Sequence, residues 1–387
     1  MDEGRRIYWV DQDRFDTKPD RSTWIETANV LCDCGYSVEI LTFGKSGYQP
    51  QDSKVKIRYF TALDTLWLFR YSLLLNILLW LIRNSGKHDV IIVHPEALII
   101  APFLRMFGRS NIHLDVRTVP VEINSFKKRL DRWLFWTFPM RYLRNAAKGY
   151  SFITDRLREA VAKEFDATFD SYALWTSGVN TDRFAGAQPA AKADEEWILF
   201  YHGTISKKRG IDRVIQAMRN VREAGGKRIR FVLFGGGPDL GDLSKLSSEL
   251  GLSDVVRFEG MHPYESIPAK LALADICICP LPDRPEWNVS SPIKVFEYMA
   301  SGKPMILTPI PSHLDIARDM DFVVWSEGDQ AEHFERAIVF AFSNLERLRE
   351  AAANGPPAAR HRFDWRIQGQ RLAAYIERTY PLQDSAG

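Results

Sequence analysis

A short stretch near the end of the chain places a cation and a carboxylate at what reads as the start of a helix. Residues 285–306 read PEWNVSSPIKVFEYMASGKPMI, and Lys294 and Glu297 stand three positions apart within them. Side chains with this spacing project from one side of a helix, and free backbone N–H groups at a helix start attract phosphate. The pair therefore fits a ligand that carries a diphosphate and a sugar hydroxyl. An ordinary surface salt bridge is the alternative, and it is the more common outcome for an isolated pair.

Two serines and a proline indicate where this helix should begin. Ser290 and Ser291 offer capping hydroxyls, and Pro292 suits the first helical turn because its fixed φ angle matches a helix. We expect the helix to stop at Gly302, a residue type that favours helix ends. The two serines would then lie beside any phosphate that the helix start attracts.

Basic residues follow another predicted strand in the second half of the chain. Gly203 comes just after a strand predicted at 197–201, and Lys208 and Arg209 precede a helix predicted over 211–224. Cations and free N–H groups at the start of a helix suit a phosphate. These three residues are therefore predicted to bind an anionic group.

A glycine-rich turn follows the next predicted strand, at 230–234. Gly235, Gly236 and Gly237 would let a ligand approach the backbone closely, although a lone glycine run is weak evidence. The chain contains neither G-x-x-x-x-G-K-[ST] nor G-x-G-x-x-G, which weakens ATPase and dinucleotide-binding interpretations. We predict no D-x-D metal site and no other metal site.

Three polar side chains follow strands in the first half. His94 comes directly after a strand predicted at 89–93, Asp115 lies at the end of a strand at 112–116, and Glu122 follows it. Ligands of parallel sheets bind beyond the carboxyl ends of the strands, so all three are candidate catalytic residues. The structural alternatives are a cap for His94, an ion pair for Asp115 and plain surface for Glu122.

The arrangement of predicted elements indicates an α/β protein with two domains. Strands alternate with helices along both halves, which is typical of parallel, doubly wound sheets. A chain of 387 residues is longer than most chains that fold around a single hydrophobic core, so two domains are expected. Residues 175–196 are turn-rich, then rich in Ala and Pro, then acidic, and this composition predicts a domain boundary.

Composition excludes several classes of protein. Hydrophobic residues make up 45% and charged residues 26% of the chain, as in ordinary folded proteins, and the net charge of +2 argues against general nucleic-acid binding. Four cysteines in two C-x-C pairs do not form a disulfide framework. Cys277 and Cys279 alternate on one predicted strand, which fits small core residues better than zinc ligands. The first residues lack an apolar signal core, so we expect a cytoplasmic protein.

Two segments suggest contact with a membrane surface. Residues 125–148 carry seven basic side chains among six aromatic ones and a single acid, Asp131, a mixture that suits anionic headgroups. A packed helix with a solvated basic face is the alternative. Residues 66–82 are almost continuously apolar but are interrupted by Arg70 and Asn76. They fit a buried or membrane-surface helix better than a membrane span.

The order of five segments resembles the GT4 family of nucleotide-sugar-dependent glycosyltransferases, which have the GT-B fold. The segments are SGVNTDRF, YHGTISKKRGIDRVIQAM, FVLFGGGPDLGDL, VVRFEGMHPYESIPAKLALADICICP and SPIKVFEYMASGKPMI. The last is similar to the S-P-x-K-x-F-E-Y-M-A variant of bacterial polysaccharide enzymes. The final WRIQGQRLAAYIERTY resembles the terminal helix that crosses back to the first domain in this fold.

The resemblance implies two Rossmann-like domains that face a cleft. The first, on the acceptor side, would comprise residues 1–178 with 366–387, and the second, which binds the donor, residues 185–365. By the same resemblance, Glu297 contacts the donor ribose and Arg209 the diphosphate.

Further site residues follow from the resemblance. His94 would lie near the transferred sugar, Gly235 to Gly237 beside the nucleotide, and His262 near the base. The chain departs from the family pattern at Val289, where a glutamate usually contacts the donor sugar, and at Thr204, where a basic diphosphate ligand is usual. Lys294 and the neighbouring serines are expected to compensate.

The expected function is transfer of a sugar from a UDP- or GDP-linked donor to a glycan or polyprenyl-linked acceptor in bacterial-type polysaccharide synthesis. We expect retention of configuration, no metal or other cofactor, and a peripheral location on the inner face of the cell membrane through 125–148 and 66–82. The alternatives are an inverting enzyme with Asp115 or Glu122 as the base, a nucleotide-sugar epimerase, and a non-catalytic assembly partner.

Overall fold

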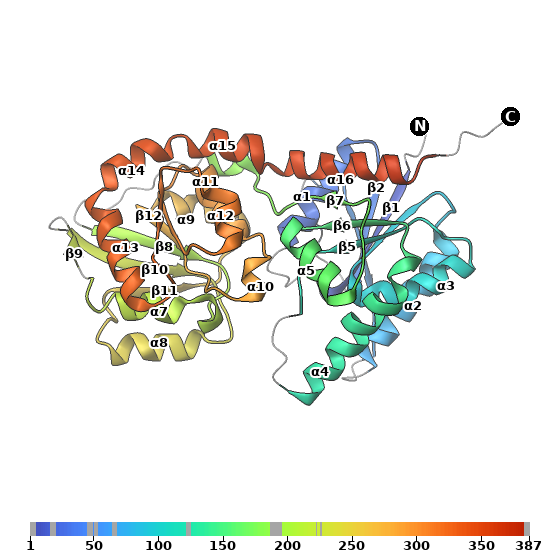
Figure 1. Cartoon of the computed structure of the whole chain (residues 1–387), viewed down its shortest axis with the longest axis horizontal. Helices are drawn as coiled ribbons and strands as arrows, with labels where there is room; N and C mark the ends of the chain where they lie inside the picture. Colours follow the sequence, from blue (N-terminus) through green and yellow to red (C-terminus); the bar gives the residue numbers. More distant parts are fainter. Residues whose placement is uncertain are drawn as a thin grey trace. The chain divides into compact units, whose positions relative to one another are not determined.

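The computed structural model describes residues 5–15, 21–44, 49, 53–63, 68–120, 125–185, 196–221, 223–224 and 227–382. The chain divides into two compact units, Met1–Ser177 with Trp365–Gly387 and Gly178–Asp364 (Figure 1). The ranges predicted from the sequence were 1–178 with 366–387, and 185–365. Each unit contains its own parallel sheet, so the predicted α/β class with two doubly wound domains is confirmed.

Unit 1 is built on a parallel sheet in the order β3-β2-β1-β4-β5-β6-β7. The order reverses between β1 and β4, because β1 pairs with β2 on one side and β4 on the other. In open α/β sheets such a reversal leaves a crevice at the carboxyl ends of the two strands. The strands are β1 (Arg6–Arg14), β2 (Ser37–Phe43), β3 (Lys56–Phe60), β4 (Val90–Val93), β5 (Ile112–Val116), β6 (Gly149–Phe152) and β7 (Ala173–Leu174).

The two faces of this sheet are covered by different helices, because successive side chains of a strand point to opposite faces. Trp9 of β1 lies in a core with Trp24 of α1 (Arg21–Asp33) and Trp365 of α16 (Trp365–Thr379). The neighbouring Tyr8 instead meets Trp80 of α2 (Phe69–Asn84), with 5.5 Å between ring centroids.

The terminal helix belongs to unit 1, as the sequence predicted. Helix α16 packs against α1, and Gly369 permits the close approach because an added Cβ there would lie 2.6 Å from the Cβ of Val30. The Tyr380 hydroxyl, just beyond the helix, donates a hydrogen bond to the Ile112 carbonyl at 2.9 Å.

In two places in unit 1, near Pro102 and Pro139, 3₁₀ or π-helical segments occur beside regular α-helix. The helix predicted over 97–107 is a 3₁₀ segment, η1 (Pro95–Ile100), followed by α3 (Ala101–Met106), because Pro102 lacks the N–H that a continuous helix requires. After α4 (Phe126–Arg132) come two π-helical segments, the second opening at Pro139. The later segments are η2 (Trp133–Thr137), η3 (Pro139–Leu143), η4 (Arg144–Ala146) and α5 (Asp155–Phe165).

Most of the apolar segment 66–82 forms α2, while residues 64–67 lie outside the described ranges. Five side chains of α2 are buried, whereas Leu75 and Leu79 are 53% and 41% exposed. No helix in the described part of the chain has the length and apolarity needed to cross a bilayer.

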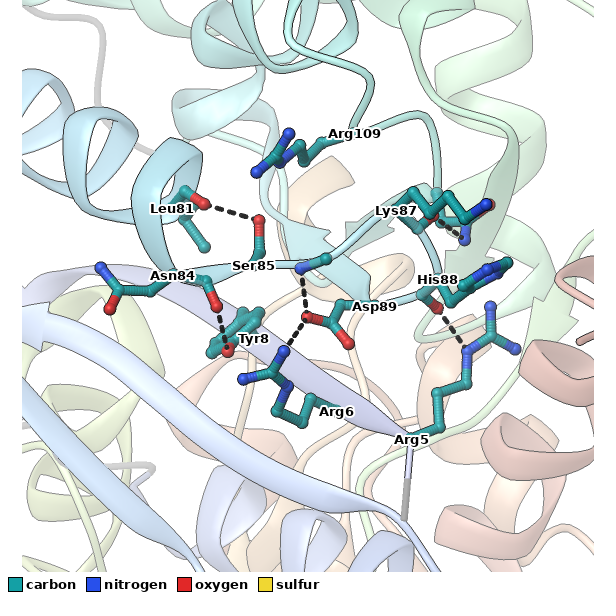
Figure 2. Close-up of polar contacts among 12 residues, drawn as sticks. Arg5, Arg6, Tyr8, Leu81, Asn84, Ser85, Lys87, His88, Asp89 and Arg109 are labelled. Atoms are coloured by element: carbon teal, nitrogen blue, oxygen red, sulfur yellow. Dashed lines mark hydrogen bonds and ion pairs between the residues drawn. The ribbon is translucent and has the colours of Figure 1, made fainter. Parts of the chain in front are cut away.

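Side chains at the amino ends of the strands hold the end of α2 in place (Figure 2). The Ser85 hydroxyl donates to the Leu81 carbonyl at 2.6 Å and the Tyr8 hydroxyl to the Asn84 carbonyl at 3.2 Å. Arg109 also donates to the Ile82 carbonyl, at 2.7 Å. The Asp89 carboxylate accepts from the Gly86 backbone N–H at 2.6 Å and pairs with Arg6 at 3.1 Å. The carbonyls at a helix end need such partners, so this network fixes α2 to β1 and β4.

Unit 2 has a second parallel sheet in the order β11-β10-β8-β12-β13-β14, with the short β9 antiparallel to β10. Its order reverses between β8 and β12, which places the expected ligand crevice at their carboxyl ends. The strands are β8 (Glu196–His202), β9 (Glu223–Ala224), β10 (Lys227–Phe234), β11 (Val256–Gly260), β12 (Ile276–Cys279), β13 (Met305–Leu307) and β14 (Val323–Trp325).

Helices cover both faces of this sheet. One core contains Leu199 and Tyr201 of β8, and the opposite core contains Phe200 and both cysteines of β12, which are buried. In the described ranges, no group of three His, Cys, Asp or Glu residues is placed to hold a metal ion. The helices are α6 (Thr181–Ala185), α7 (Ile211–Ala217), α8 (Leu240–Glu249), α9 (Ile267–Ala272), α10 (Pro285–Asn288), α11 (Ile293–Ala300), α12 (Pro311–Ala317), α13 (Ala331–Ser343), α14 (Leu345–Ala352) and α15 (Gly355–Arg362).

The tight contact between α16 and α1 predicts opposite effects for two Gly-to-Ala substitutions. Gly241 in α8 has nothing within 4 Å of an added Cβ, so Gly241→Ala should stabilise unit 2 by about 0.5–1 kcal/mol through helix propensity. Gly369→Ala should destabilise unit 1 by about 1–2 kcal/mol, because overpacking against Val30 outweighs that gain. Denaturant unfolding measures both changes. A Gly369→Ala protein as stable as the wild type would contradict this packing.

Candidate functional site

Lys294 and Glu297 lie on α11, as the sequence predicted, but they do not form a surface salt bridge. Lys294 is 7% and Glu297 1% exposed, and no ion pair joins them among the described residues. The predicted serine cap is also absent, because Pro292 occupies the N-cap position and the Ser290 hydroxyl donates to the Trp287 carbonyl at 2.8 Å. Both charged groups are therefore buried in unit 2, where each needs a specific partner or ligand.

The Glu297 carboxylate has two partners within unit 2. Its Oε1 accepts a hydrogen bond from the Tyr264 hydroxyl at 2.8 Å, and its Oε2 lies 2.9 Å from His202 Nε2. His202 is the last residue of β8, so the carboxylate is held at the strand end that borders the predicted crevice. Both partners are neutral or titratable groups, and the carboxylate keeps lone pairs for further donors.

Lys294 lies beside Tyr201 and has no carboxylate partner among the described residues. Its Nζ lies 5.2 Å from the centroid of the Tyr201 ring, and no described residue accepts a hydrogen bond from it. Burial, followed by repulsion from the Arg209 guanidinium, lowers the pKa of Lys294 from 10.5 to about 8. A positive charge here is thus costly in the free protein, and an anionic ligand would relieve that cost.

Arg209 approaches the same tyrosine from the turn that follows β8. Burial raises the pKa of the Tyr201 hydroxyl, and the nearby Arg209 guanidinium opposes that rise. The guanidinium carbon lies 4.9 Å from the centroid of the Trp287 ring. No ion pair of Arg209 with a described carboxylate occurs. Two cations therefore flank Tyr201, each held by aromatic groups that leave its charge unneutralised.

The turn itself is held against the end of β12. Lys207–Arg209 form a single 3₁₀ turn, η5, and Gly210 has φ +75° with no room for a side chain, because an added Cβ would lie 2.2 Å from the Pro280 carbonyl oxygen. The Lys208 carbonyl accepts a hydrogen bond from the Trp287 indole at 3.0 Å. The following helix, α7, ends at Ala217, seven residues before the predicted end.

Glycines let the loops after β8 and β10 meet. An added Cβ on Gly235 would lie 1.9 Å from the Gly203 carbonyl oxygen, and one on Gly237 would lie 2.1 Å from the Ile205 oxygen. Gly203 in turn borders Lys294, whose Nζ would lie 3.6 Å from a Cβ at that position. The predicted glycines thus line the backbone beside the cation pair.

Three predicted donor-site residues lie around this centre. Ser291 is buried just before α11, and Ser290 is part of the loop that Trp287 holds. His262 donates from Nε2 to the Glu259 carbonyl at 3.2 Å and packs edge-on against Phe234, with 5.2 Å between ring centroids. The neighbouring Met261 is 82% exposed and leans over Gly236.

The candidate catalytic residues of the first half all belong to unit 1. His94 follows β4 at the reversal point of the sheet, and its Nδ1 lies 2.9 Å from the Asp115 carbonyl oxygen. A carbonyl only accepts, so Nδ1 carries a proton, and in the neutral ring Nε2 is then the acceptor nitrogen. Trp24 packs edge-on against the ring, with 4.6 Å between centroids.

Asp115 lies in the interior of unit 1. It is 1% exposed, and its Oδ1 accepts from the Ser151 hydroxyl at 2.6 Å and the Trp175 indole at 3.1 Å. Burial raises the pKa of this carboxyl from 3.8 to about 6, although Arg117 and the two hydrogen bonds oppose the shift. This environment favours a structural role over proton transfer with a substrate. Glu122 lies outside the described residues.

Four residues at the centre of the site were missed from the sequence. Tyr201 and His202 are the last two residues of β8. Their position at a strand end, next to the predicted Gly203, is the sequence signal that could have identified them. Tyr264 and Trp287 lie in loops, and their contacts depend on tertiary packing. No sequence spacing relates either of them to Glu297 or Arg209.

The sequence comparisons identify unit 2. Residues 182–356 match the family model described as glycosyl transferases group 1. A curated relative from Mycolicibacterium smegmatis, described as a GDP-mannose-dependent alpha-(1-6)-phosphatidylinositol monomannoside mannosyltransferase, is 24% identical over 250 residues. That match covers 61% of this chain and 64% of the relative, so the chain spans less than two thirds of the relative's length.

Solved structures share the whole fold. Sucrose-phosphate synthase from Thermosynechococcus elongatus superposes with a TM-score of 0.77 at 14% identity, covering 97% of this chain and 99% of that one. HepE from Anabaena, solved in complex with UDP-glucose, gives a TM-score of 0.73 at 15% identity, covering 96% and 99%. The chain therefore has the GT-B fold, and residues 182–356 of its second unit are similar to the group 1 glycosyl transferases.

Proposed function

We propose that this protein transfers a sugar from a nucleoside diphosphate to a glycan or lipid-linked acceptor. The observation that carries the proposal is the pair of cations beside Tyr201, Arg209 and Lys294, neither of which pairs with a described carboxylate. They lie beside the strand end where the order of the sheet reverses, within the part of the chain that matches the glycosyltransferase model. A diphosphate would supply the negative charge that both lack.

The chemistry places a specific demand on this pair. As the bond between the anomeric carbon and the diphosphate oxygen breaks, the departing diphosphate gains negative charge. Arg209 and Lys294 would stabilise that charge from fixed positions, which is the most effective way for an enzyme to lower such a barrier. Because two side chains supply the positive charge, we propose that transfer requires no metal ion, and activity in the presence of EDTA tests this.

Glu297 is proposed to hold the donor ribose. Its carboxylate is buried and fixed by Tyr264 and His202, yet it retains lone pairs that ribose hydroxyls would fill. Val289 offers no carboxylate to the transferred sugar, so contacts to the sugar hydroxyls must come from other groups. One named relative is described as GDP-mannose-dependent and one solved neighbour is in complex with UDP-glucose, and we therefore propose a UDP- or GDP-linked hexose as the donor.

We propose that the reaction retains the anomeric configuration. An inverting enzyme needs a carboxylate that takes the proton of the acceptor hydroxyl, and Asp115 is buried and already hydrogen-bonded. The acceptor nitrogen of His94 is proposed to position the donor sugar instead. Incubation with labelled UDP- and GDP-sugars, scored for slow hydrolysis and for the anomer released, tests both donor and stereochemistry. No turnover of any nucleotide-sugar, with tight nucleotide binding, would indicate a non-catalytic partner.

The lowered pKa of Lys294 predicts how nucleotide affinity changes with pH. A diphosphate binds the ammonium form, so affinity for UDP or GDP should fall as the pH rises through about 8. Loss of one charged hydrogen bond corresponds to a weakening of about 10- to 100-fold at high pH. Calorimetry between pH 7 and pH 9.5 measures it.

Two variants control this experiment. Lys294→Met should bind weakly at every pH, with little pH dependence, whereas Lys245→Met, at an exposed lysine of the same unit, should behave as the wild type. Wild-type affinity that stays constant over this pH range would contradict a role for Lys294 in diphosphate binding.

We also propose that unit 1 binds an anionic membrane surface. Within 125–148, three large apolar side chains are at least half exposed, namely Phe126 (75%), Trp133 (50%) and Tyr142 (66%). Exposed basic residues accompany them, namely Lys127, Lys128, Arg129, Arg141 and Lys148. We call these eight side chains the aromatic-basic surface. Apolar groups that enter the headgroup region and cations that pair with lipid phosphates are what a peripheral membrane protein requires.

Helix α2 packs against the segment that carries the aromatic-basic surface. Arg70 pairs with Asp131 at 3.1 Å, and Tyr71 packs against Phe135 with 5.2 Å between ring centroids. Tyr8 of β1 donates to the far end of α2 (Figure 2), so the segment that carries the aromatic-basic surface packs on a helix joined to the sheet. A location at the inner face of the cell membrane is therefore part of the proposal.

Flotation with vesicles containing anionic lipid should recover the wild-type protein. Changing Lys127, Lys128, Arg129 and Arg132 to Glu should reduce recovery at least about tenfold, since each cation near an anionic surface contributes on the order of 1 kcal/mol.

The matched control changes Lys245, Arg257, Arg318 and Arg347 to Glu, which alters net charge equally but on unit 2. This control should still float. Equal recovery of both variants, or recovery of the wild type without vesicles, would contradict the membrane proposal.

A further inference from the structure

Trp287 connects the two basic elements of the candidate site, although neither the sequence motifs nor the proposed reaction assigns it a role. Its indole N–H donates to the Lys208 carbonyl at 3.0 Å, and its ring lies 4.9 Å from the Arg209 guanidinium carbon. Trp287 therefore contacts both the backbone of the basic turn and the side chain proposed to meet the diphosphate.

The same residue fixes the loop that leads into α11. Its carbonyl accepts hydrogen bonds from the Ser290 backbone N–H at 3.1 Å and from the Ser290 hydroxyl at 2.8 Å. Lys294 follows four residues later on α11. One tryptophan thus ties the turn that carries Arg209 to the loop that precedes Lys294.

The chemistry of the contact matters as much as its position. A carboxylate partner would orient Arg209 but would also neutralise it, and a ligand would have to compete for the charge. An aromatic ring attracts a guanidinium through its negative face while leaving the charge available to an anion. Tyr201 also lies near the guanidinium, so both of these neighbouring side chains are aromatic and uncharged.

We propose that Trp287 is a positioning residue that holds Arg209 ready for the donor diphosphate. It acts through Arg209 and not by touching the substrate. The inference rests on the proposed nucleotide-sugar function of unit 2. Without the ring, the long arginine side chain would return to many rotamers, and binding a diphosphate would require it to be ordered again.

The experiment measures UDP or GDP affinity by calorimetry for four variants. Trp287→Leu removes both contacts and should weaken binding about 3- to 30-fold. Trp287→Phe keeps a ring over Arg209 but loses the donor to Lys208, and should fall between Trp287→Leu and the wild type. Arg209→Gln provides the background for a double-mutant cycle, in which Trp287→Leu should cause no further loss.

The matched control is Trp197→Leu, which removes a partly buried tryptophan of the same unit that stacks on Phe342. It should lower thermal stability without changing nucleotide affinity. Should Trp287→Leu fail to fold, Trp287→Gln, which keeps a side-chain N–H but removes the ring over Arg209, carries the same test in the wild-type and Arg209→Gln backgrounds.

The outcomes separate this inference from the function on which it rests. Wild-type protein that binds no nucleotide overturns the proposed function itself. Nucleotide binding that depends on Arg209 but is unchanged in Trp287→Leu overturns only the positioning role. The positioning role is also overturned if Trp287→Leu weakens nucleotide binding by the same factor in the Arg209→Gln background. Trp287 would then act independently of the arginine.

Discussion

The candidate site of unit 2 depends on two cations, Lys294 and Arg209, and on the aromatic side chains that hold them. Lys294 is buried and repelled by Arg209, and both conditions lower its pKa toward physiological values. Neither cation has a carboxylate partner among the described residues, and the rings of Tyr201 and Trp287 stabilise them without cancelling their charge. The sheet and the loops around the two cations bring these groups together. The strand order brings the ends of β8 and β12 together, and glycines at 203, 235 and 237 let the loops close around the pair.

Unit 1 uses its buried polar groups differently. Asp115, Ser151 and His113 form a hydrogen-bonded network in the interior, which Tyr380 reaches from the end of the terminal helix. Burial lowers the pKa of His113 to about 3, so it stays neutral and serves as a hydrogen-bonding core residue. This network ties Tyr380, just after α16, to β5 and β6. It favours a structural role for Asp115, although the position of this residue in the sequence resembles that of a catalytic group.

The sequence predicted the α/β class and the two doubly wound sheets, because these depend on local patterns. The roles of the charged residues stay a prediction. Alternating strands and helices determine a doubly wound sheet, and the spacing of Lys294 and Glu297 determines that they share a helix face. What it missed depends on tertiary contacts. The burial of Asp115 follows from neighbours on β6 and from Trp175, and the Ser290 hydroxyl bonds to Trp287 instead of capping α11. The helix predicted over 97–107 changed its form because Pro102 removes one N–H. No periodicity would have placed Trp287 beside Arg209.

The most direct test of the central claim is a crystal structure of the protein with UDP or GDP bound. The diphosphate should lie within hydrogen-bonding distance of both Arg209 and Lys294, and a ribose hydroxyl should donate to Glu297. The Trp287 ring should keep its place over the guanidinium. A nucleotide bound elsewhere on unit 2, with its diphosphate away from both cations, would contradict the role proposed for them.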